Sequence, residues 1–422
     1  MWVLPVSAMV AALIVARLTR YLNSVTEYHF FGFGMQGARA AVSMIAASTL
    51  TFVVFFFSVL LLTVQVASAS LSPRIIARPF QSHALKASLA LFVFTFIYGV
   101  AVLGRLEDQV LELPVFITVV LSVASVGTFL FVVEFVSKEL RPVTVVAGVA
   151  SDGLHIIRTV YPLPWTGATR PPEAALSKES VCQSFRHEGN AGVVIAFHLE
   201  KLLAMAVKHD CVIELVPQVG DYVPSGGHLF QIRGGRSLIR AKELRNAIML
   251  GRERTMEQDP AFAFRIIVDI AEKALSAAIN DPTTAVLAID QIQCLLQEVG
   301  ERDLSTGVVK DEHGRVRLIY RTPNWQDFVL LAVSEVRQCG ANSVQITRRL
   351  HGMLESLITV LPPARAPALQ QQLDLLRAAV ERSFLDPPDR FQAEIADSQG
   401  LGGTLHLDGD AEWTNPDPFE TG

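Results

Sequence analysis

Residues 40–66 read AAVSMIAASTLTFVVFFFSVLLLTVQV, a run that contains no Asp, Glu, Lys, Arg or His. Charge-free runs also cover 87–104 and 113–133, and a shorter one covers 1–16. A bilayer core about 30 Å thick needs roughly 20 apolar residues at about 1.5 Å each, and its backbone groups must be paired within a helix. The sequence therefore predicts a membrane domain over residues 1–140. Its four expected helices lie near 2–16, 40–66, 87–104 and 113–136.

The run at 1–16 is the least regular of the four, because it is short and contains Pro5. A signal peptide has basic residues before its apolar core, whereas Arg17 and Arg20 follow this one. We interpret the run as a short membrane-spanning helix. A start that is assigned too late is the alternative.

Basic residues near the helix ends predict the orientation. With a cytoplasmic N-terminus, the inner flanks hold five of them and the outer flanks hold four: Arg74, Arg78, Lys86, Lys138 and Arg141 against Arg17, Arg20, Arg39 and Arg105. The four cysteines follow the membrane domain and show no pairing pattern, which suits a reducing compartment. We therefore expect a multi-pass protein of the inner (plasma) membrane, with a cytoplasmic soluble domain.

Glu134 is the acidic residue at the end of the fourth run, four positions before Lys138. Acids inside a membrane are candidates for function. The spacing also fits an ion pair along one helix face at the membrane interface, which we favour.

Residues 142–235 predict a small β-rich domain. Leu154–Val160 is rich in β-branched residues, and Gly192–Phe197 and Cys211–Val216 are short apolar runs. Apolar residues at helical spacing between the last two predict a helix there.

The stretch Val219–Leu229 (Val-Gly-Asp-Tyr-Val-Pro-Ser-Gly-Gly-His-Leu) predicts two tight turns around a short strand. It resembles the corner of barrel-sandwich folds, the architecture of lipoyl and biotinyl carrier domains. The modified lysine of those carriers has no counterpart here, so the resemblance implies no carried cofactor. His228 has no accompanying cluster with metal-ligand spacing, and we interpret it as a turn residue.

Residues 237–385 predict a helical domain. Asp259-Pro260 and Asp281-Pro282 each have the form of a helix start, with Asp as N-cap and Pro in the first turn. Asn280 tolerates the left-handed conformation that closes the preceding helix. The fold class is thus membrane α-helical plus an α+β domain, in which a barrel-sandwich-like β unit precedes a helical bundle.

Polar residues concentrate around these two helix starts. Asp269 lies between Arg265 and Lys273, each four positions away, which favours a structural ion pair. The alternative is a polar cluster that binds a small anion or forms a subunit contact. That candidate site comprises Arg252, Arg254, Asp259, Asp269, Asn280 and Asp281.

Several of these motifs are similar to those of a bacterial family of predicted membrane proteins of unknown function. The matching pieces span residues 1 to about 360: Trp2–Pro5, Ser70–Arg74, Gly220–Gly227, Arg254-Thr255, Gln258-Asp259, Ala274–Ala285 and Trp325–Asn342. Ala277 departs from the pattern, where Pro is expected. The resemblance implies four membrane helices and a cytoplasmic-type domain, and it implies no activity.

Residues 386–422 contain nine acidic residues and one basic residue, with few apolar ones. Such a composition predicts an acidic, disordered tail.

The chain shows no catalytic, phosphate-binding or dinucleotide-binding motif, so we assign no catalytic residue, metal or cofactor. A net charge of −5 without a basic block argues against nucleic acid as a partner. The expected partners are the lipid bilayer and further copies of the chain in a homo-oligomer. Two classes remain open: a channel, transporter or sensor whose soluble domain regulates the membrane helices, and a membrane-tethered enzyme for a lipid or small anionic metabolite. A membrane scaffold is a third option.

Overall fold

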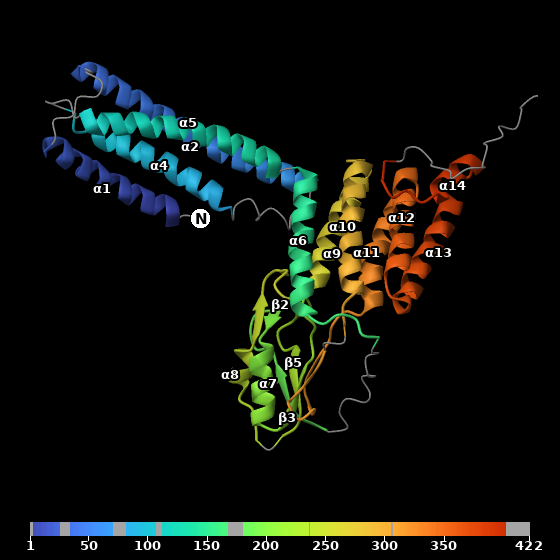
Figure 1. Ribbon diagram of the computed structural model, residues 1–422. Coiled ribbons are helices and arrows are strands. Elements are labelled where there is room, and N and C mark those ends of the chain that lie inside the picture. Colours follow the sequence, from blue (N-terminus) through green and yellow to red (C-terminus); the bar gives the residue numbers. More distant parts are fainter. Residues whose placement is uncertain are drawn as a thin grey trace, which may run out of the picture.

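The computed structural model describes residues 3–25, 34–70, 82–106, 112–139, 141–167, 180–235, 237–304 and 307–401. Figure 1 shows three parts, which we call the membrane bundle, the C-terminal bundle and the β unit. Arg74 and Arg78 of the predicted inner flanks, and residues 402–422 of the predicted tail, lie outside the described residues.

The membrane bundle consists of four long apolar helices, which confirms the predicted apolar helices at the N-terminal end of the chain. Every one of them is longer than its charge-free run. They are α1 (Val3–Val25), α2 (Met35–Ser70), α4 (His83–Leu103) and α5 (Glu112–Glu139). The helix at the N-terminus continues past Arg17 and Arg20, whose side chains are exposed. Long basic side chains can extend toward the headgroups, so they need not end a membrane helix.

Aromatic and hydroxyl side chains fill the interior of the membrane bundle. Phe56 and Phe92 are buried between α2 and α4. The Thr19 and Tyr98 hydroxyls join α1 to α4 at 3.0 Å, and Ser125 donates to Thr95 at 3.2 Å between α5 and α4. The outward faces are apolar and exposed, as expected of surfaces that contact lipid.

Helix α6 (Pro142–Val160) corrects the prediction of a strand at Leu154–Val160. Its β-branched residues lie at helical spacing, so Val146, Val149 and Ile157 share one buried face. Five described helices are long and apolar enough to cross a membrane, and α6 is the fifth. Its apolar face, however, belongs to the core of the C-terminal bundle.

The C-terminal bundle packs six helices around one apolar core, to which α6 contributes. The other five are α9 (Pro260–Leu275), α10 (Pro282–Gly300), α11 (Trp325–Gly340), α12 (Val344–Val360) and α13 (Ala366–Ser383), the last preceded by the 3-10 turn Pro363–Arg365. Asp259 and Asp281 are the N-caps of α9 and α10, and Asn280 has a φ of 49°, so these three predictions are confirmed.

The β unit contains two sheets around a second apolar core. The first sheet has the order β1-β5-β3-β8-β7, with β3 and β8 parallel, and the second has the order β4-β2-β6. The strands are β1 (Val181–Arg186), β2 (Gly192–Phe197), β3 (Cys211–Leu215), β4 (Tyr222–Val223), β5 (His228–Gly234), β6 (Ile248–Gly251), β7 (Val308–Lys310) and β8 (Val316–Tyr320). Helices α7 (Leu199–Lys208) and α8 (Ala241–Arg245) complete the unit.

These bounds correct the predicted division at residue 235. The segment 142–160 is a helix of the C-terminal bundle, while β6, β7 and β8 lie inside the segment expected to be helical. The predicted strands at 192–197 and 211–216 and the helix between them are present. Two turns at Gly220 and Gly226 have the positive φ values that favour glycine, 90° and 80°.

The start of the acidic tail is ordered, in contrast to its prediction as disordered from residue 386. Helix α14 (Pro387–Glu394) packs on α12 and α13. The amide of Asp397 donates to the Arg348 carbonyl at 3.1 Å, and the backbone of Asp397 lies against Gly352. The composition is polar, but the close approach at Gly352 fixes this segment on the bundle.

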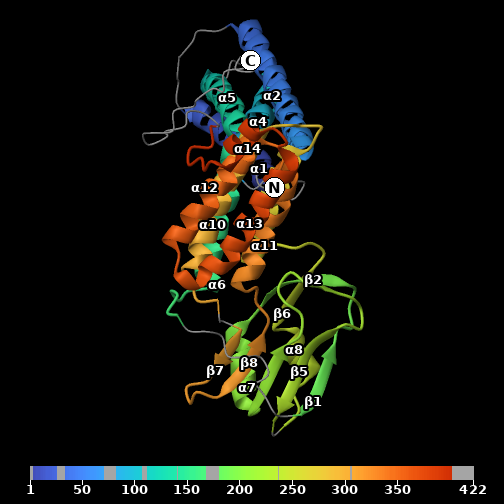
Figure 2. The same cartoon turned by 90° about the vertical axis from the view of Figure 1, so that its right-hand side faces the viewer.

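Figures 1 and 2 together place the membrane bundle and the β unit at opposite ends of the C-terminal bundle. Helix α6 follows α5 and runs from the membrane end toward the β unit, where it ends. At about 1.5 Å per residue, its 19 residues cover about 28 Å.

His351 on α12 is buried, and neither ring nitrogen has a hydrogen-bond partner among the described residues. Burial, assisted by the charge of Arg377, lowers the pKa of His351 to about 4. Because the folded pKa lies below the unfolded value, protonation favours unfolding. Stability is therefore retained above about pH 6.5 and lost as the pH falls toward 4.

We predict that His351→Leu removes this part of the acid sensitivity. Between pH 7 and 4.5 the wild type should lose about 2–3 kcal/mol more than the variant, measured by urea unfolding in detergent. The exposed His313→Leu variant is the control and should follow the wild type. Equal acid losses in wild type and His351→Leu would contradict the assignment.

Candidate functional site

The structure does not bring the six predicted site residues together. Asp259 caps the start of α9, whereas Asn280 and Asp281 follow its end. The 16 residues of α9 separate these positions by about 24 Å. Asp269 lies in the middle of α9 with its own ion partner, Arg265, and Arg252 is exposed, without a partner among the described residues. One small anion therefore cannot contact the whole predicted cluster.

Arg254 and Asp259 form the first of the separate groups, at the junction between the β unit and the C-terminal bundle. Arg254 Nε donates to Asp259 Oδ2 at 2.5 Å, and Asp259 Oδ1 accepts from the Phe262 amide at 3.1 Å. Burial raises the pKa of Asp259, although the Arg254 guanidinium opposes this shift. The same guanidinium packs on Gly220, where an added Cβ would lie 2.6 Å from it. The pair thus joins the Gly-Asp turn of the β unit to the start of α9.

Gln258, the neighbour of Asp259, makes a second connection across the junction. Its amide nitrogen donates to the Phe197 carbonyl at 3.2 Å, and its amide oxygen accepts from the Phe197 amide at 3.0 Å. The side chain therefore pairs with the end of β2 as a neighbouring strand would. Gln258 and Arg254 hold the β unit on α9 through polar contacts.

A cavity of about 210 Å³ lies at this junction. Its walls come from the end of α6, the β2–α7 turn, the segment before Gly220, the start of α9 and the segment after β8. The lining residues are Thr159, Val160, Tyr161, Phe197, Leu199, Gln218, Val219, Gln258, Asp259, Pro260, Tyr320, Arg321, Thr322 and Pro323. The ring centres of Phe197 and Tyr320 lie 4.9 Å apart, and the two rings are arranged edge to face. The cavity is thus apolar in part, with a few polar groups, which is the usual character of a small-molecule site.

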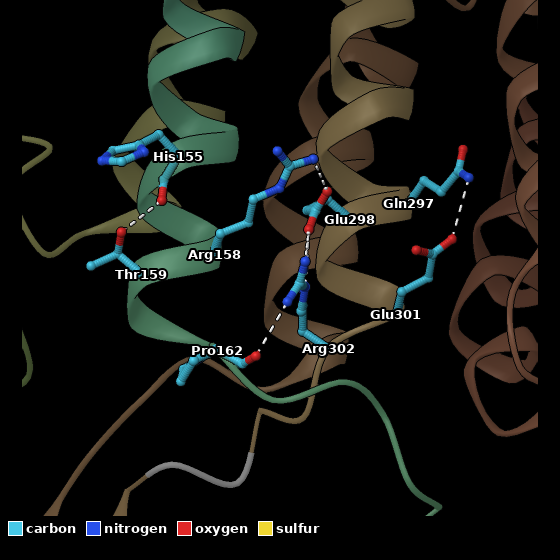
Figure 3. A network of polar contacts seen from close by, with 8 residues as sticks. All are labelled: His155, Arg158, Thr159, Pro162, Gln297, Glu298, Glu301 and Arg302. Atoms are coloured by element: carbon cyan, nitrogen blue, oxygen red, sulfur yellow. Dashed lines mark hydrogen bonds and ion pairs between the residues drawn. The ribbon is translucent and has the colours of Figure 1, made fainter.

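The end of α6 beside this cavity is fixed by the ion pairs of Figure 3. Glu298 on α10 accepts from Arg158 on α6 at 2.8 Å and from Arg302 at 2.5 Å. Arg302 also donates to the Pro162 carbonyl at 3.3 Å. The hydrogen bond from Arg158, the main cause, lowers the pKa of Glu298. Helices α6 and α10 therefore end together, and the end of α6 lines the cavity.

Asp269 belongs to an ionic cluster further along α9. Arg265 donates to Asp269 at 2.5 Å, to Glu272 at 2.8 Å and to Glu335 on α11. Burial and the charge of Glu335 raise the pKa of Glu272. The predicted ion pair of Asp269 with Arg265 is present, and it ties α9 to α11.

The segment before Asp281 closes α9 and starts α10. The Asp281 amide donates to the Ala274 carbonyl at 2.8 Å, and its carboxylate accepts from the Thr284 amide and hydroxyl. Asn280 is exposed beside it. These contacts explain the Asn-Asp-Pro motif as a turn between two helices.

Glu134 pairs with Lys138 at 2.6 Å, as the spacing predicts. Both side chains are more than 60% exposed (67% and 63%). The favoured interpretation as an ion pair along one helix face agrees with this geometry.

Sequence reasoning missed Arg365, which closes the end of the C-terminal bundle. Its guanidinium lies 4.2 Å from the centre of the Trp165 ring and 5.3 Å from that of Trp325, and it donates to the Arg302 carbonyl at 2.9 Å. Burial lowers the pKa of Arg365. No local motif marks it, because its partners are distant in the sequence. Gln218 and Arg321 of the cavity were missed for the same reason.

The fold defines a membrane protein with apolar helices at its N-terminal end and a sheet-containing C-terminal region. The chain belongs to the family described as "Predicted membrane protein (DUF2254)", whose model matches residues 1–356. This finding confirms the family resemblance seen in the motifs.

Relatives of this chain occur in mycobacteria. "Uncharacterized protein Rv1290c" of Mycobacterium tuberculosis and "Uncharacterized protein Mb1321c" of Mycobacterium bovis are each 28% identical over 369 residues. The match covers 84% of this chain and 70% of each relative. No solved structure matches the chain.

We predict that Arg254→Ala destabilises the C-terminal region, because it leaves the Asp259 carboxylate buried without its charged partner. Since Arg254 is itself partly exposed, the expected loss is about 2 kcal/mol rather than the larger loss of a fully buried pair. Urea unfolding in detergent measures it.

Arg252→Ala is the matched control, since it removes an exposed arginine two positions away. Its expected effect is within about 0.5 kcal/mol. Equal losses in the two variants would show that the Arg254–Asp259 contact does not support the junction.

Proposed function

We propose that this protein is a membrane sensor, in which the C-terminal region controls the arrangement of the membrane helices. The observation that supports this proposal is the position of α6. This helix follows the last membrane helix in the chain, and its apolar face is part of the C-terminal core. A change in the C-terminal bundle therefore has a direct path to α5.

Helix α6 follows α5 closely in the chain and packs tightly on its neighbours. Helix α5 ends at Glu139 and α6 begins at Pro142. Gly153 of α6 lies so close to its neighbours that an added Cβ would be 2.8 Å from the Ala263 side chain and 3.1 Å from that of Leu295. Close packing of this kind transmits displacement instead of absorbing it.

Helix α2 provides a second connection. Its 36 residues extend about 54 Å, well beyond a hydrocarbon core of about 30 Å. It contacts α9, the helix whose start lines the cavity. The membrane bundle is thus linked to the C-terminal bundle through α2 and α5.

The output we propose is a rearrangement of membrane helices in a homo-oligomer. Large side chains fill the interior of the membrane bundle, including Phe56, Phe92 and Tyr98. A path for ions would therefore lie between subunits, where the exposed apolar faces of the membrane helices meet.

We also propose four membrane spans, with the C-terminal region in the cytoplasm at the inner membrane. The apolar face of α6 is already buried in the C-terminal bundle, which supports a position outside the bilayer. Cys182, Cys211, Cys294 and Cys339 are all free thiols, which suits a reducing compartment.

We predict that Gly153→Val displaces α6 and, with it, α5. Spin labels at Leu130 on α5 and Val10 on α1, both exposed on the membrane bundle, should report a distance change on the order of 1–2 Å in liposomes. A label pair at His155 and Leu375 confirms the displacement of α6 itself. The native cysteines are replaced in all samples.

Gly127→Val on α5 is the control, because an added Cβ there meets nothing within 4 Å. It should leave both distances unchanged. A displaced α6 with an unchanged α5–α1 distance would refute the coupling. If the output is ion flux, only the Gly153 variant should alter flux from that of wild-type liposomes.

We predict that a membrane-impermeant maleimide labels the exposed Cys294 and Cys339 only after the inner membrane is opened. Gly34→Cys is the matched control. Gly34 directly precedes α2, which begins at the end of the membrane bundle away from the C-terminal bundle (Figure 1), and it has open space around it. It should be labelled in cells with an intact inner membrane. The reverse pattern would place the C-terminal region outside.

A further inference from the structure

The junction cavity has two polar side chains without a hydrogen-bond or ion-pair partner in the part of the chain that the structure describes. Among the described residues, no hydrogen bond or ion pair joins the Arg321 guanidinium or the Gln218 side-chain amide to another group. The other charged side chain of the lining, Asp259, is held by Arg254. Arg321 is exposed, so it lies where the cavity opens to solvent. Within the described lining, the cavity therefore offers the Arg321 guanidinium and the Gln218 amide to a ligand.

The remaining walls favour a flat apolar group. Phe197, Tyr161 and Tyr320 contribute aromatic rings, and Val160, Val219 and Pro260 add aliphatic surface. Aromatic side chains contact planar ligands edge-on or in offset stacks. The volume of about 210 Å³ is below the usual range of about 300–1,000 Å³ for drug-sized ligands. A single ring with a short substituent suits such a space.

The charge of the ligand follows from Arg321 and Asp259 together. A guanidinium matches the two oxygens of a carboxylate or phosphate. The buried Asp259 carboxylate lines the same cavity but is already paired with Arg254, so among the described lining residues the single charge of Arg321 is left for the ligand. A monoanion is therefore favoured over a doubly charged phosphate.

We propose that the junction cavity binds a small organic monocarboxylate with a ring-sized apolar body, and that Arg321 pairs with its carboxylate. Gln218 donates a hydrogen bond to the same group, and the three aromatic residues enclose the ring. The role of the ligand as a signal rests on the sensor function proposed above, whereas its binding does not.

The position of the site explains how occupancy reaches the membrane helices. Thr159 and Val160, the last residues of α6, line the cavity together with Pro260 at the start of α9. A ligand thus contacts both helices that connect to the membrane bundle. It can shift their arrangement only if it binds one arrangement more tightly than the other.

The test uses the full chain in detergent and a panel of benzoate, phenylacetate and cyclohexanecarboxylate, with benzamide and inorganic phosphate as comparison ligands. Titration calorimetry should detect at least one carboxylate with a Kd below about 5 mM, and weaker or no binding of benzamide and phosphate. Arg321→Gln should weaken that carboxylate about tenfold or more. Thr322→Phe, which fills the cavity without changing its charge, should abolish binding.

Arg252→Gln is the control, because it removes a nearby exposed arginine that does not line the cavity. It should bind as the wild type does. The proposal is overturned if no carboxylate of the panel binds, if benzamide or phosphate binds as tightly, or if Arg321→Gln and Arg252→Gln bind equally. Circular dichroism confirms that each variant is folded.

Two measurements separate this proposal from the sensor function. If a carboxylate binds through Arg321 but leaves the α5–α1 label distance unchanged, the binding site stands and its signalling role fails. If Gly153→Val moves α5 while no carboxylate binds, the coupling stands and the ligand class is wrong.

Discussion

The packing of α6 against α9 and α10 is the constraint on which the arrangement of this protein depends. The buried face of α6 includes Val146, Val149 and Ile157, and burial of each such side chain contributes roughly 1.5–3 kcal/mol. Several of these contributions together make it costly to detach α6 from the bundle. Helices α5 and α6 run in different directions (Figure 1), and the apolar surface of α5 lies in the membrane bundle whereas that of α6 lies in the C-terminal bundle.

The middle of α6 and its C-terminal end are held in different ways. Along its length the contacts are apolar and close, with Gly153 allowing the approach. At its end, Arg158 pairs with Glu298, and beyond it the β unit is held by the polar contacts of Arg254 and Gln258. The two apolar cores are separate clusters, and polar interfaces between units permit relative movement more readily than a shared core does. The cavity lies at this polar interface between the β unit and the C-terminal bundle.

Sequence patterns predicted the features that depend on local physics. Charge-free runs identified the membrane helices, and Asp-Pro pairs identified the starts of α9 and α10, because both depend on residues within one or two turns. The strand prediction at Leu154–Val160 failed because β-branched residues also fit a buried helix face when tertiary contacts hold them there. The strands after residue 237 were missed for a related reason: β8 pairs in parallel with β3, about a hundred residues earlier in the chain.

The candidate site shows the same limit more sharply. Closeness in sequence suggested one cluster, yet the 16 residues of α9 separate Asp259 from Asn280 and Asp281, and Asp269 pairs with Arg265 instead. What the sequence could not show is that Thr159, Gln218, Asp259 and Arg321 meet in space, because they come from four segments of two structural units. A ligand bound where these segments meet would contact both structural units, and so it could favour one arrangement of the two units over another. Its contacts span a polar, separable interface on one side and a tightly packed helix on the other. In the function that we propose, binding energy that favours one arrangement of the interface would act on α6, and the close packing of α6 would carry the displacement toward α5.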